Sequence, residues 1–168
     1  MARPIRLPIQ YRPRTPFVYW SLRVEGAGRW GWMLVSGLCL GAIVTAAILK
    51  PDPRGHGTHE QLGLPPCSFM LTTGLPCPTC GMTSAFSLVV RGKVLEGIIA
   101  QPASAALCLL TIIMLPISLW TVATGRSICV NWDRLGAVRV SLAFAMIFVG
   151  AWGFKLLQAL ATGQYLTR

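Results

Sequence analysis

Three long apolar stretches with almost no charged residue dominate the hydrophobicity pattern of the chain. They cover residues 30–49, 103–123 and 140–161, and only Lys155 interrupts the third. Because a helix rises about 1.5 Å per residue, about 20 residues cross the roughly 30 Å hydrocarbon core of a bilayer. The pattern therefore predicts an all-α integral membrane protein with three transmembrane helices.

Two residues, a proline and a lysine, interrupt this simple pattern. Pro116 lies inside the second stretch, where a proline kinks a membrane helix rather than ending it. Lys155 lies near the end of the third stretch, so we expect its side chain to reach the membrane–water interface. A lysine buried for a functional reason is the alternative.

The long connection between the first two spans, residues 50–102, contains two shorter apolar segments. Gly81–Val90 is too short to cross a bilayer, and Lys93–Ala100 carries apolar residues at helical spacing. These features predict short interfacial or re-entrant helices within the first loop.

The chain is expected to form one membrane domain, residues 30–161. A basic, proline-rich tail, residues 1–29, precedes it, and a short C-terminal tail, residues 162–168, follows it. Four prolines between Pro4 and Pro16 favour an extended, polyproline-like conformation in the first tail.

Composition supports a membrane protein and argues against a nucleic-acid binder. Of 168 residues, 54% are hydrophobic and 12% are charged, and the formal net charge is +10. A soluble domain carries about 25% charged residues. The basic residues lie in the gaps between apolar stretches and form no continuous basic face, which indicates a topology signal. We therefore expect the lipid bilayer as partner and no nucleic acid.

The distribution of arginines predicts the orientation. The first tail carries six arginines and one glutamate, and residues 124–139 carry three arginines and one aspartate, whereas residues 50–102 are nearly balanced. By the positive-inside rule, the N-terminus is cytoplasmic, and the long loop and the C-terminus are extracytoplasmic.

The six cysteines divide into two groups. Cys39 and Cys108 lie in spans, where a lone cysteine is usually a small apolar side chain, and Cys129 lies in the predicted cytoplasmic loop. The other three, Cys67, Cys77 and Cys80, lie in the long loop.

Cys77-Pro-Thr-Cys80-Gly81 fits two chemical devices. In a metal knuckle, proline fixes the turn, both thiolates bind one ion, and glycine permits the tight backbone. In a redox pair, a helix N-terminus lowers the pKa of the first cysteine and the second resolves the mixed disulfide. Gly81 favours the knuckle, whereas the apolar run after it favours the redox helix, so both remain open.

Cys67 offers a third sulfur ligand for a metal, with zinc as the candidate ion. Structural zinc takes four ligands, and His56 or His59 is a candidate for the fourth, although both histidines also fit a solvated loop. A structural disulfide is a further alternative, since oxidation is permitted outside the cytoplasm. Three thiols are an odd set, so one would then be left over or pair with a partner.

The segment Thr73–Phe86 resembles the signature of a bacterial membrane family, domain of unknown function 2752, whose members read Pro-Cys-Pro-x-Cys-Gly-x-Thr-Arg-Ala. Cys67, Arg91-Gly92 and Pro102 fit its layout too, and Ser84 stands where that family usually has arginine. The resemblance covers roughly residues 67–123. It implies a small polytopic protein of the bacterial cytoplasmic (inner) membrane and no established activity.

Three functions remain as hypotheses. The first is a scaffold or subunit of a larger membrane assembly, with other membrane subunits as partners and a metal or disulfide in the outer loop. The second is a thiol-disulfide oxidoreductase using Cys77 and Cys80, and the third is a transporter or channel component. Three spans are few for a cofactor pocket, and Lys155 and Gln158 are few polar groups for a transport path, so we favour the scaffold over an enzyme.

Overall fold

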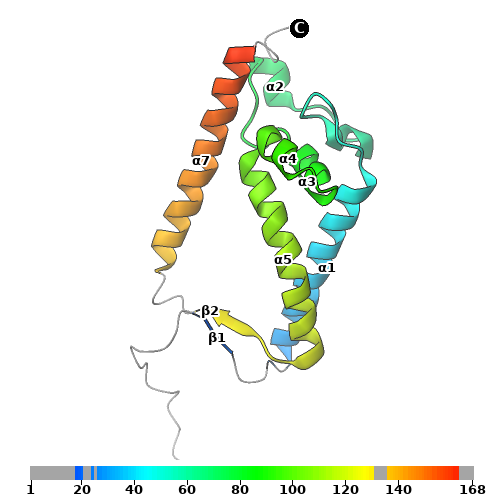
Figure 1. Cartoon of the computed structure of the whole chain (residues 1–168), viewed down its shortest axis with the longest axis vertical. Coiled ribbons are helices and arrows are strands. Elements are labelled where there is room, and N and C mark those ends of the chain that lie inside the picture. The colour runs from blue at the N-terminus through cyan, green and yellow to red at the C-terminus, as the bar shows by residue number, and fades with distance from the viewer. Residues whose placement is uncertain (1–17, 21–23, 25, 131–135, 163–168) are drawn as a thin grey trace, which may run out of the picture.

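A computed structural model of the chain describes residues 18–20, 24, 26–130 and 136–162. Its three long helices are α1 (Ala27–Ile48), α5 (Pro102–Thr124) and α7 (Ala137–Thr162) (Figure 1). All three are long and apolar enough to cross a membrane. The prediction of an all-α membrane protein with three spans is therefore confirmed, and α5 continues as a helix through Pro116.

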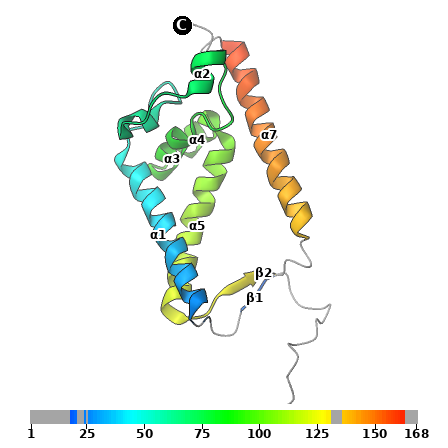
Figure 2. The same ribbon diagram turned by 180° about the vertical axis from the view of Figure 1, so that it is seen from behind.

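The three helices alternate in direction, and the long loop between α1 and α5 lies at one end of the molecule (Figure 1). The C-terminal ends of α1 and α7 and the N-terminal end of α5 lie at this end. The segment between α5 and α7 lies at the opposite end, as the view from behind also shows (Figure 2).

Helices α1 and α5 pack against each other along much of their length. At the start of α1, the Arg29 guanidinium donates two hydrogen bonds, of 3.0 and 2.7 Å, to the carbonyl of Val122 near the end of α5. Such carbonyls have no partner within their own helix, so this contact satisfies one of them. The side chains of α1 that face away from α5, including Trp30, Leu34 and Leu38, are exposed, as a lipid-facing surface requires.

Four short helices form the long loop, and two of them were predicted. Helices α3 (Met82–Val90) and α4 (Val94–Ala100) correspond to the two apolar segments, whereas η1 (Thr58–Leu62) and α2 (Ser68–Thr73) were not foreseen.

Helix α3 is wedged between α1 and α5. Val89 packs with Ala105 and Cys108 of α5 in a small buried core. The guanidinium of Arg91 donates to the carbonyls of Ala46 (3.0 Å) and Ala47 (2.8 Å), which satisfies the C-terminal end of α1. These contacts fix α3, and with it the cysteine segment that precedes it, relative to the spans.

Helix α7 contacts the rest of the described chain through its C-terminal half only. Residues 141–150 are exposed, whereas Ala151, Lys155 and Ala159 are buried at intervals of one helical turn. The expectation that Lys155 reaches the interface is wrong, because its side chain is 2% exposed and turns inward to the cysteine loop. Its ammonium group donates hydrogen bonds to backbone carbonyls there, those of Cys80 and Ala100.

Two strands of three residues each were not predicted. β1 (Val18–Trp20) and β2 (Ile128–Val130) pair antiparallel, with Tyr19 opposite Cys129. The extended tail expected around Pro4 to Pro16 and the C-terminal tail after residue 162 lie outside the described residues.

Candidate metal centre

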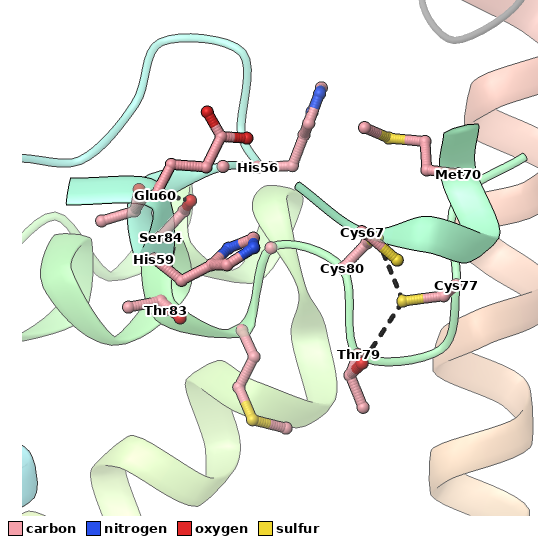
Figure 3. Close-up of a pocket in the computed structure, with 14 residues that line it drawn as sticks. His56, His59, Glu60, Cys67, Met70, Cys77, Thr79, Cys80, Thr83 and Ser84 are labelled. Atoms are coloured by element: carbon pink, nitrogen blue, oxygen red, sulfur yellow. Dashed lines mark hydrogen bonds between the residues drawn. The ribbon is translucent and has the colours of Figure 1, made fainter. Parts of the chain in front are cut away.

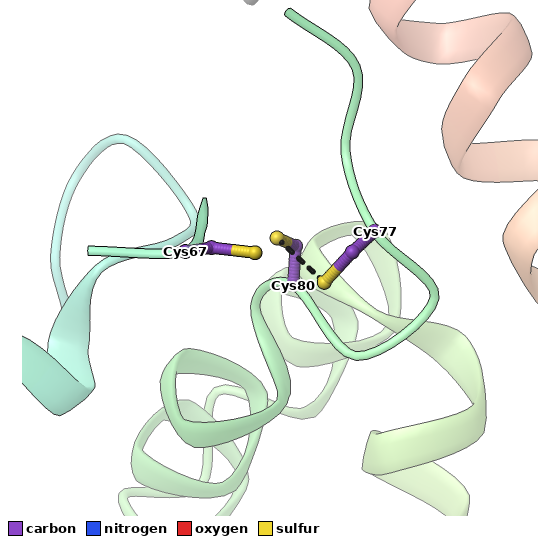
Figure 4. A group of neighbouring side chains, drawn as sticks. All are labelled: Cys67, Cys77 and Cys80. Atoms are coloured by element: carbon purple, nitrogen blue, oxygen red, sulfur yellow. Dashed lines mark hydrogen bonds between the residues drawn. The ribbon is translucent and has the colours of Figure 1, made fainter. Parts of the chain in front are cut away.

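Cys67, Cys77 and Cys80 converge at one point in the long loop (Figure 4). Their sulfurs all lie within 4.8 Å of one another, and all three are free thiols. Cys67 is the residue directly before α2, and the other two lie in the turn before α3. The structure thus brings together sulfurs from two separate segments, in a group that could hold a metal ion.

The turn that carries Cys77 and Cys80 is closed by its own backbone. The amide of Cys80 donates to the carbonyl of Cys77 (3.1 Å), and the amide of Met82 donates to the carbonyl of Thr79 (3.1 Å). Gly81 follows with φ +85°, a left-handed conformation that disfavours residues with a Cβ. This is the tight backbone expected of a metal knuckle.

Gly81 is also required for space. A Cβ at this position would lie 2.6 Å from the carbonyl oxygen of Gly55 and against the ammonium group of Lys155. The turn is therefore packed from behind by the loop before η1 and by α7.

Side chains from outside the turn donate to its outward-facing carbonyls. The Gln101 amide donates to the carbonyl of Pro78 (2.7 Å), and the Trp152 indole donates to that of Pro76 (3.1 Å). Lys155 donates to the carbonyl of Cys80 and to that of Ala100 (2.8 Å). On the other side of the turn, the amide and the hydroxyl of Thr79 are hydrogen-bond partners of the Cys77 sulfur, and the hydroxyl oxygen lies 3.3 Å from it.

These donors make the two thiols of the turn unequal. Burial raises the pKa of Cys77, but hydrogen bonds from Thr79, Cys80 and Cys67 outweigh burial and lower the pKa to about 7. Burial, together with the hydrogen bond to Cys77, raises the pKa of Cys80 to about 12. The two sulfurs are 3.0 Å apart, so the two thiols titrate as a coupled pair in which the negative charge is favoured on Cys77.

The position of α3 bears on one feature of the predicted redox pair, the helix N-terminus at its first cysteine. The helix begins at Met82, five positions after Cys77, so Cys77 does not sit at its N-terminus. The low pKa of Cys77 therefore comes from local hydrogen bonds. Three sulfurs on one zinc ion, bound at about 2.3 Å, lie about 3.8 Å apart in a tetrahedral arrangement. The group fits such an ion if Cys77 and Cys80 separate by less than about 1 Å.

The two histidines lie on the same cavity as the cysteines but outside the group of three (Figure 3). His56 is largely buried, and its Nδ1 is 2.9 Å from the carbonyl oxygen of Arg54. Burial lowers the pKa of His56 and so favours the neutral ring. In Figure 3 the ring of His59 points toward the side on which the cysteines lie, whereas the ring of His56 points away.

A buried pair of hydroxyls joins the histidine segment to α3. Thr58 and Ser84 are fully buried, and their hydroxyl oxygens are 2.7 Å apart. The amide of Asp52 also donates to the hydroxyl of Thr58 (3.0 Å). Ser84 thus has a structural partner at the position where arginine is usual in the family that the sequence resembles.

The sequence analysis missed the residues that hold the turn from outside. The sequence gives no indication that Gln101 and Trp152 bind the turn, because their hydrogen-bond partners are backbone carbonyls far away along the chain. For Lys155 there was an indication, as the only charge within the three apolar stretches, and the alternative of a buried lysine pointed to it.

Comparison with known proteins now adds to this geometry. Residues 67–115 match the family described as protein of unknown function (DUF2752). The resemblance predicted from the sequence is thereby confirmed for this segment. The DUF2752 segment begins at Cys67 and contains all three clustered cysteines, α3, α4 and the first part of α5. No curated protein and no solved structure matches the chain.

Proposed function

We propose that this chain is a membrane-embedded scaffold whose outer loop is fixed by a zinc ion on Cys67, Cys77 and Cys80. The proposal rests on the position of Cys67 beside the Cys77–Cys80 turn, because the three sulfur atoms all lie within 4.8 Å of one another. A redox pair needs two sulfurs, whereas a metal ion needs three or four ligands, so the third sulfur favours the metal.

The charges around the turn support a metal–thiolate centre. Among the described residues, no carboxylate pairs with the buried ammonium of Lys155. A buried charge is costly unless it is compensated, and the sulfurs of the turn are the nearest groups that can become anions. Three thiolates with one divalent ion carry one net negative charge, which the single positive charge of Lys155 balances.

A scaffolding role follows from what the turn holds together. It joins α2, α3 and α7, and α7 docks through Trp152 and Lys155 directly on the carbonyls of the turn. A metal that rigidifies the turn therefore also fixes the third span. The exposed half of α7, residues 141–150, is the surface on which we expect other membrane subunits to pack.

We further propose that the centre faces the extracytoplasmic side of a bacterial inner membrane. The long loop and the C-terminal end of α7 lie at one end of the molecule, and the start of α1, the end of α5 and the start of α7 lie at the other (Figure 1). Arg29 and Arg139 belong to the first turns of α1 and α7, and Arg126 lies two positions after the end of α5. The positive-inside rule assigns the arginine-bearing end to the cytoplasm.

Metal analysis of the full-length protein tests the proposal. Protein purified in detergent under reducing conditions, without chelator, is expected to contain one zinc ion per chain. Cys67→Ser should lose it, whereas Cys39→Ser, which changes a cysteine in α1 outside the group, should keep it. Zinc-free wild-type protein would overturn the proposal.

Sidedness needs a separate measurement. In intact cells treated with a zinc chelator and a reductant, a membrane-impermeant alkylating reagent should modify Cys77. Modification of Cys77 only after the membrane is permeabilised would overturn the proposed orientation.

A second candidate function is a thiol-disulfide oxidoreductase, which the unequal thiols favour. Cys77 is partly exposed with a pKa of about 7, and Cys80 is buried with a pKa of about 12, as an attacking and a resolving thiol would be. The two functions differ in their response to Cys67→Ser. An oxidoreductase should retain thiol exchange in this variant, whereas the metal centre should be lost.

A further inference from the structure

A second cavity, of about 430 Å³, has none of the three clustered cysteines in its wall. The wall consists of residues 51–55, residues of α3 and α4, Lys93 directly before α4, and Gln158 of α7. Sites for small molecules have volumes of about 300–1,000 Å³, so this cavity is large enough for a small organic group.

The cavity lies at the depth where the three spans end. Residues 51–55 begin three positions after α1 ends, α4 ends two positions before α5 begins, and Gln158 is four positions before the end of α7. These three helix ends lie at the same end of the molecule (Figure 1). The ends of membrane spans mark the headgroup region of a bilayer, so phospholipid headgroups surround the molecule at this depth.

The charges of the wall are balanced. The charged side chains that line the cavity are two of each sign, those of Asp52, Arg54, Lys93 and Glu96. A ligand with one positive and one negative charge therefore leaves the wall and ligand neutral together, whereas an anion or a cation would add an uncompensated charge. Lys93 pairs with Glu96 at 3.1 Å, and both side chains are 56% exposed. Because an exposed pair of this kind contributes little stability, each partner can bind a ligand instead.

Arg54 adds a hydrogen-bond donor that its own pairing does not use. Its Nε and Nη2 donate to the two carboxylate oxygens of Asp52, at 3.0 and 2.7 Å, and Nη2 is 3.5 Å from Glu60. Within the described part of the chain, Nη1 has no hydrogen-bond partner. Asp52 thus holds the guanidinium in place, and Nη1 is left for a ligand. A guanidinium suits a phosphate group in particular.

Apolar side chains around the cavity favour a lipid over a soluble compound. Ile99 lines the cavity, and Ile99, Ile98 and Leu95 of α4 are all exposed. Leu157, the neighbour of Gln158 in α7, is exposed as well. The acyl chains of a lipid would cover these side chains, whereas a soluble compound would leave them uncovered.

We propose that this cavity binds the headgroup of a phospholipid with a phosphate diester and a primary ammonium group, as in phosphatidylethanolamine. The phosphate accepts hydrogen bonds from Lys93 and from Nη1 of Arg54, and the ammonium donates to the carboxylate of Glu96. A primary ammonium has hydrogens to donate, whereas the quaternary ammonium of phosphatidylcholine has none. The site uses no cysteine, so it does not depend on the proposed metal centre.

Native mass spectrometry of the full-length protein, freed of lipid in detergent, tests the inference. Phosphatidylethanolamine, phosphatidylglycerol and phosphatidylcholine with the same acyl chains are offered in equal amounts. The protein should retain phosphatidylethanolamine at least about threefold more than either of the others, and Lys93→Gln should lower its retention about threefold or more. Glu96→Gln leaves the wall with a net positive charge and should reverse the preference toward the anionic phosphatidylglycerol. Arg139→Gln, an exposed position in the first turn of α7, should leave the preference unchanged.

Three results would overturn the inference. Equal retention of the three lipids would remove the charge argument, and so would an unchanged preference in Glu96→Gln. Displacement of the lipid by an equal concentration of glycerophosphoethanolamine would mean that the cavity takes a soluble compound. Zinc-free protein would overturn the proposed metal centre and leave these lipid preferences as they are.

Discussion

Replacing Gly81 by alanine should destabilise the protein far more than the same change at Gly92. Both glycines have a left-handed backbone, with φ +85° and +79°, and an alanine there costs about 1–2 kcal/mol at either position. Gly92 is exposed and open, and a methyl group there would meet no neighbouring side chain or backbone atom within 4 Å. At Gly81 the methyl group would lie 2.6 Å from the carbonyl oxygen of Gly55, and overpacking of this kind costs about 1–3 kcal/mol more.

The expected loss is therefore about 2–5 kcal/mol for Gly81→Ala and about 1–2 kcal/mol for Gly92→Ala. Thermal unfolding of the full-length protein in detergent, followed by circular dichroism, measures both. Zinc content should also fall in Gly81→Ala and stay unchanged in Gly92→Ala. Equal losses of stability at the two positions would refute the packing of the cysteine turn described above.

Three further predictions concern the contacts around the turn. Thr58→Val and Ser84→Ala should each cost about 1–3 kcal/mol, because each leaves a buried hydroxyl or its partner unpaired, and the double variant should cost less than their sum. In metal-free, reduced protein, alkylation of Cys77 should accelerate as the pH rises through about 7, because its thiolate forms there, whereas Cys80, with a pKa of about 12, should stay unreactive up to pH of about 9. Trp152→Phe should lower the free energy of unfolding by about 1 kcal/mol, because the hydrogen bond to the turn is lost while the ring remains.

Each of these measurements has its own control and its own contrary result. Additive losses in the double variant would mean that the two hydroxyls do not interact. Alkylation of both thiols with the same pH profile, read by mass spectrometry of the peptides, would contradict their inequality. For Trp152, the exposed Trp120 of α5 is the matched position, and equal effects of the two Trp→Phe changes would contradict the docking of α7 on the turn.

The spans and the motif could be predicted because their signals are local. A run of about 20 uncharged residues leaves few options other than a transmembrane helix, and α1, α5 and α7 follow from that alone. The Cys77–Cys80 spacing likewise brings two sulfurs together within one turn, whatever the rest of the chain does.

The assembly around the motif could not be predicted, because it depends on contacts between distant segments. Cys67 reaches the turn from a separate segment, directly before α2, and that segment had no strong periodic signal. Lys155 looked like a residue at the end of a helix, which usually extends to the interface. Its burial depends on the carbonyls of Cys80 and Ala100, which are 75 and 55 positions away along the chain.

X-ray absorption at the zinc edge is the most direct test of the central claim. On full-length protein purified with its native metal, the account predicts three sulfur neighbours at about 2.3 Å and one lighter neighbour. In Cys67→Ser that retains any zinc, the number of sulfurs should fall to two. A first shell made only of nitrogen and oxygen, or one that does not change in Cys67→Ser, would contradict a metal centre built from Cys67, Cys77 and Cys80.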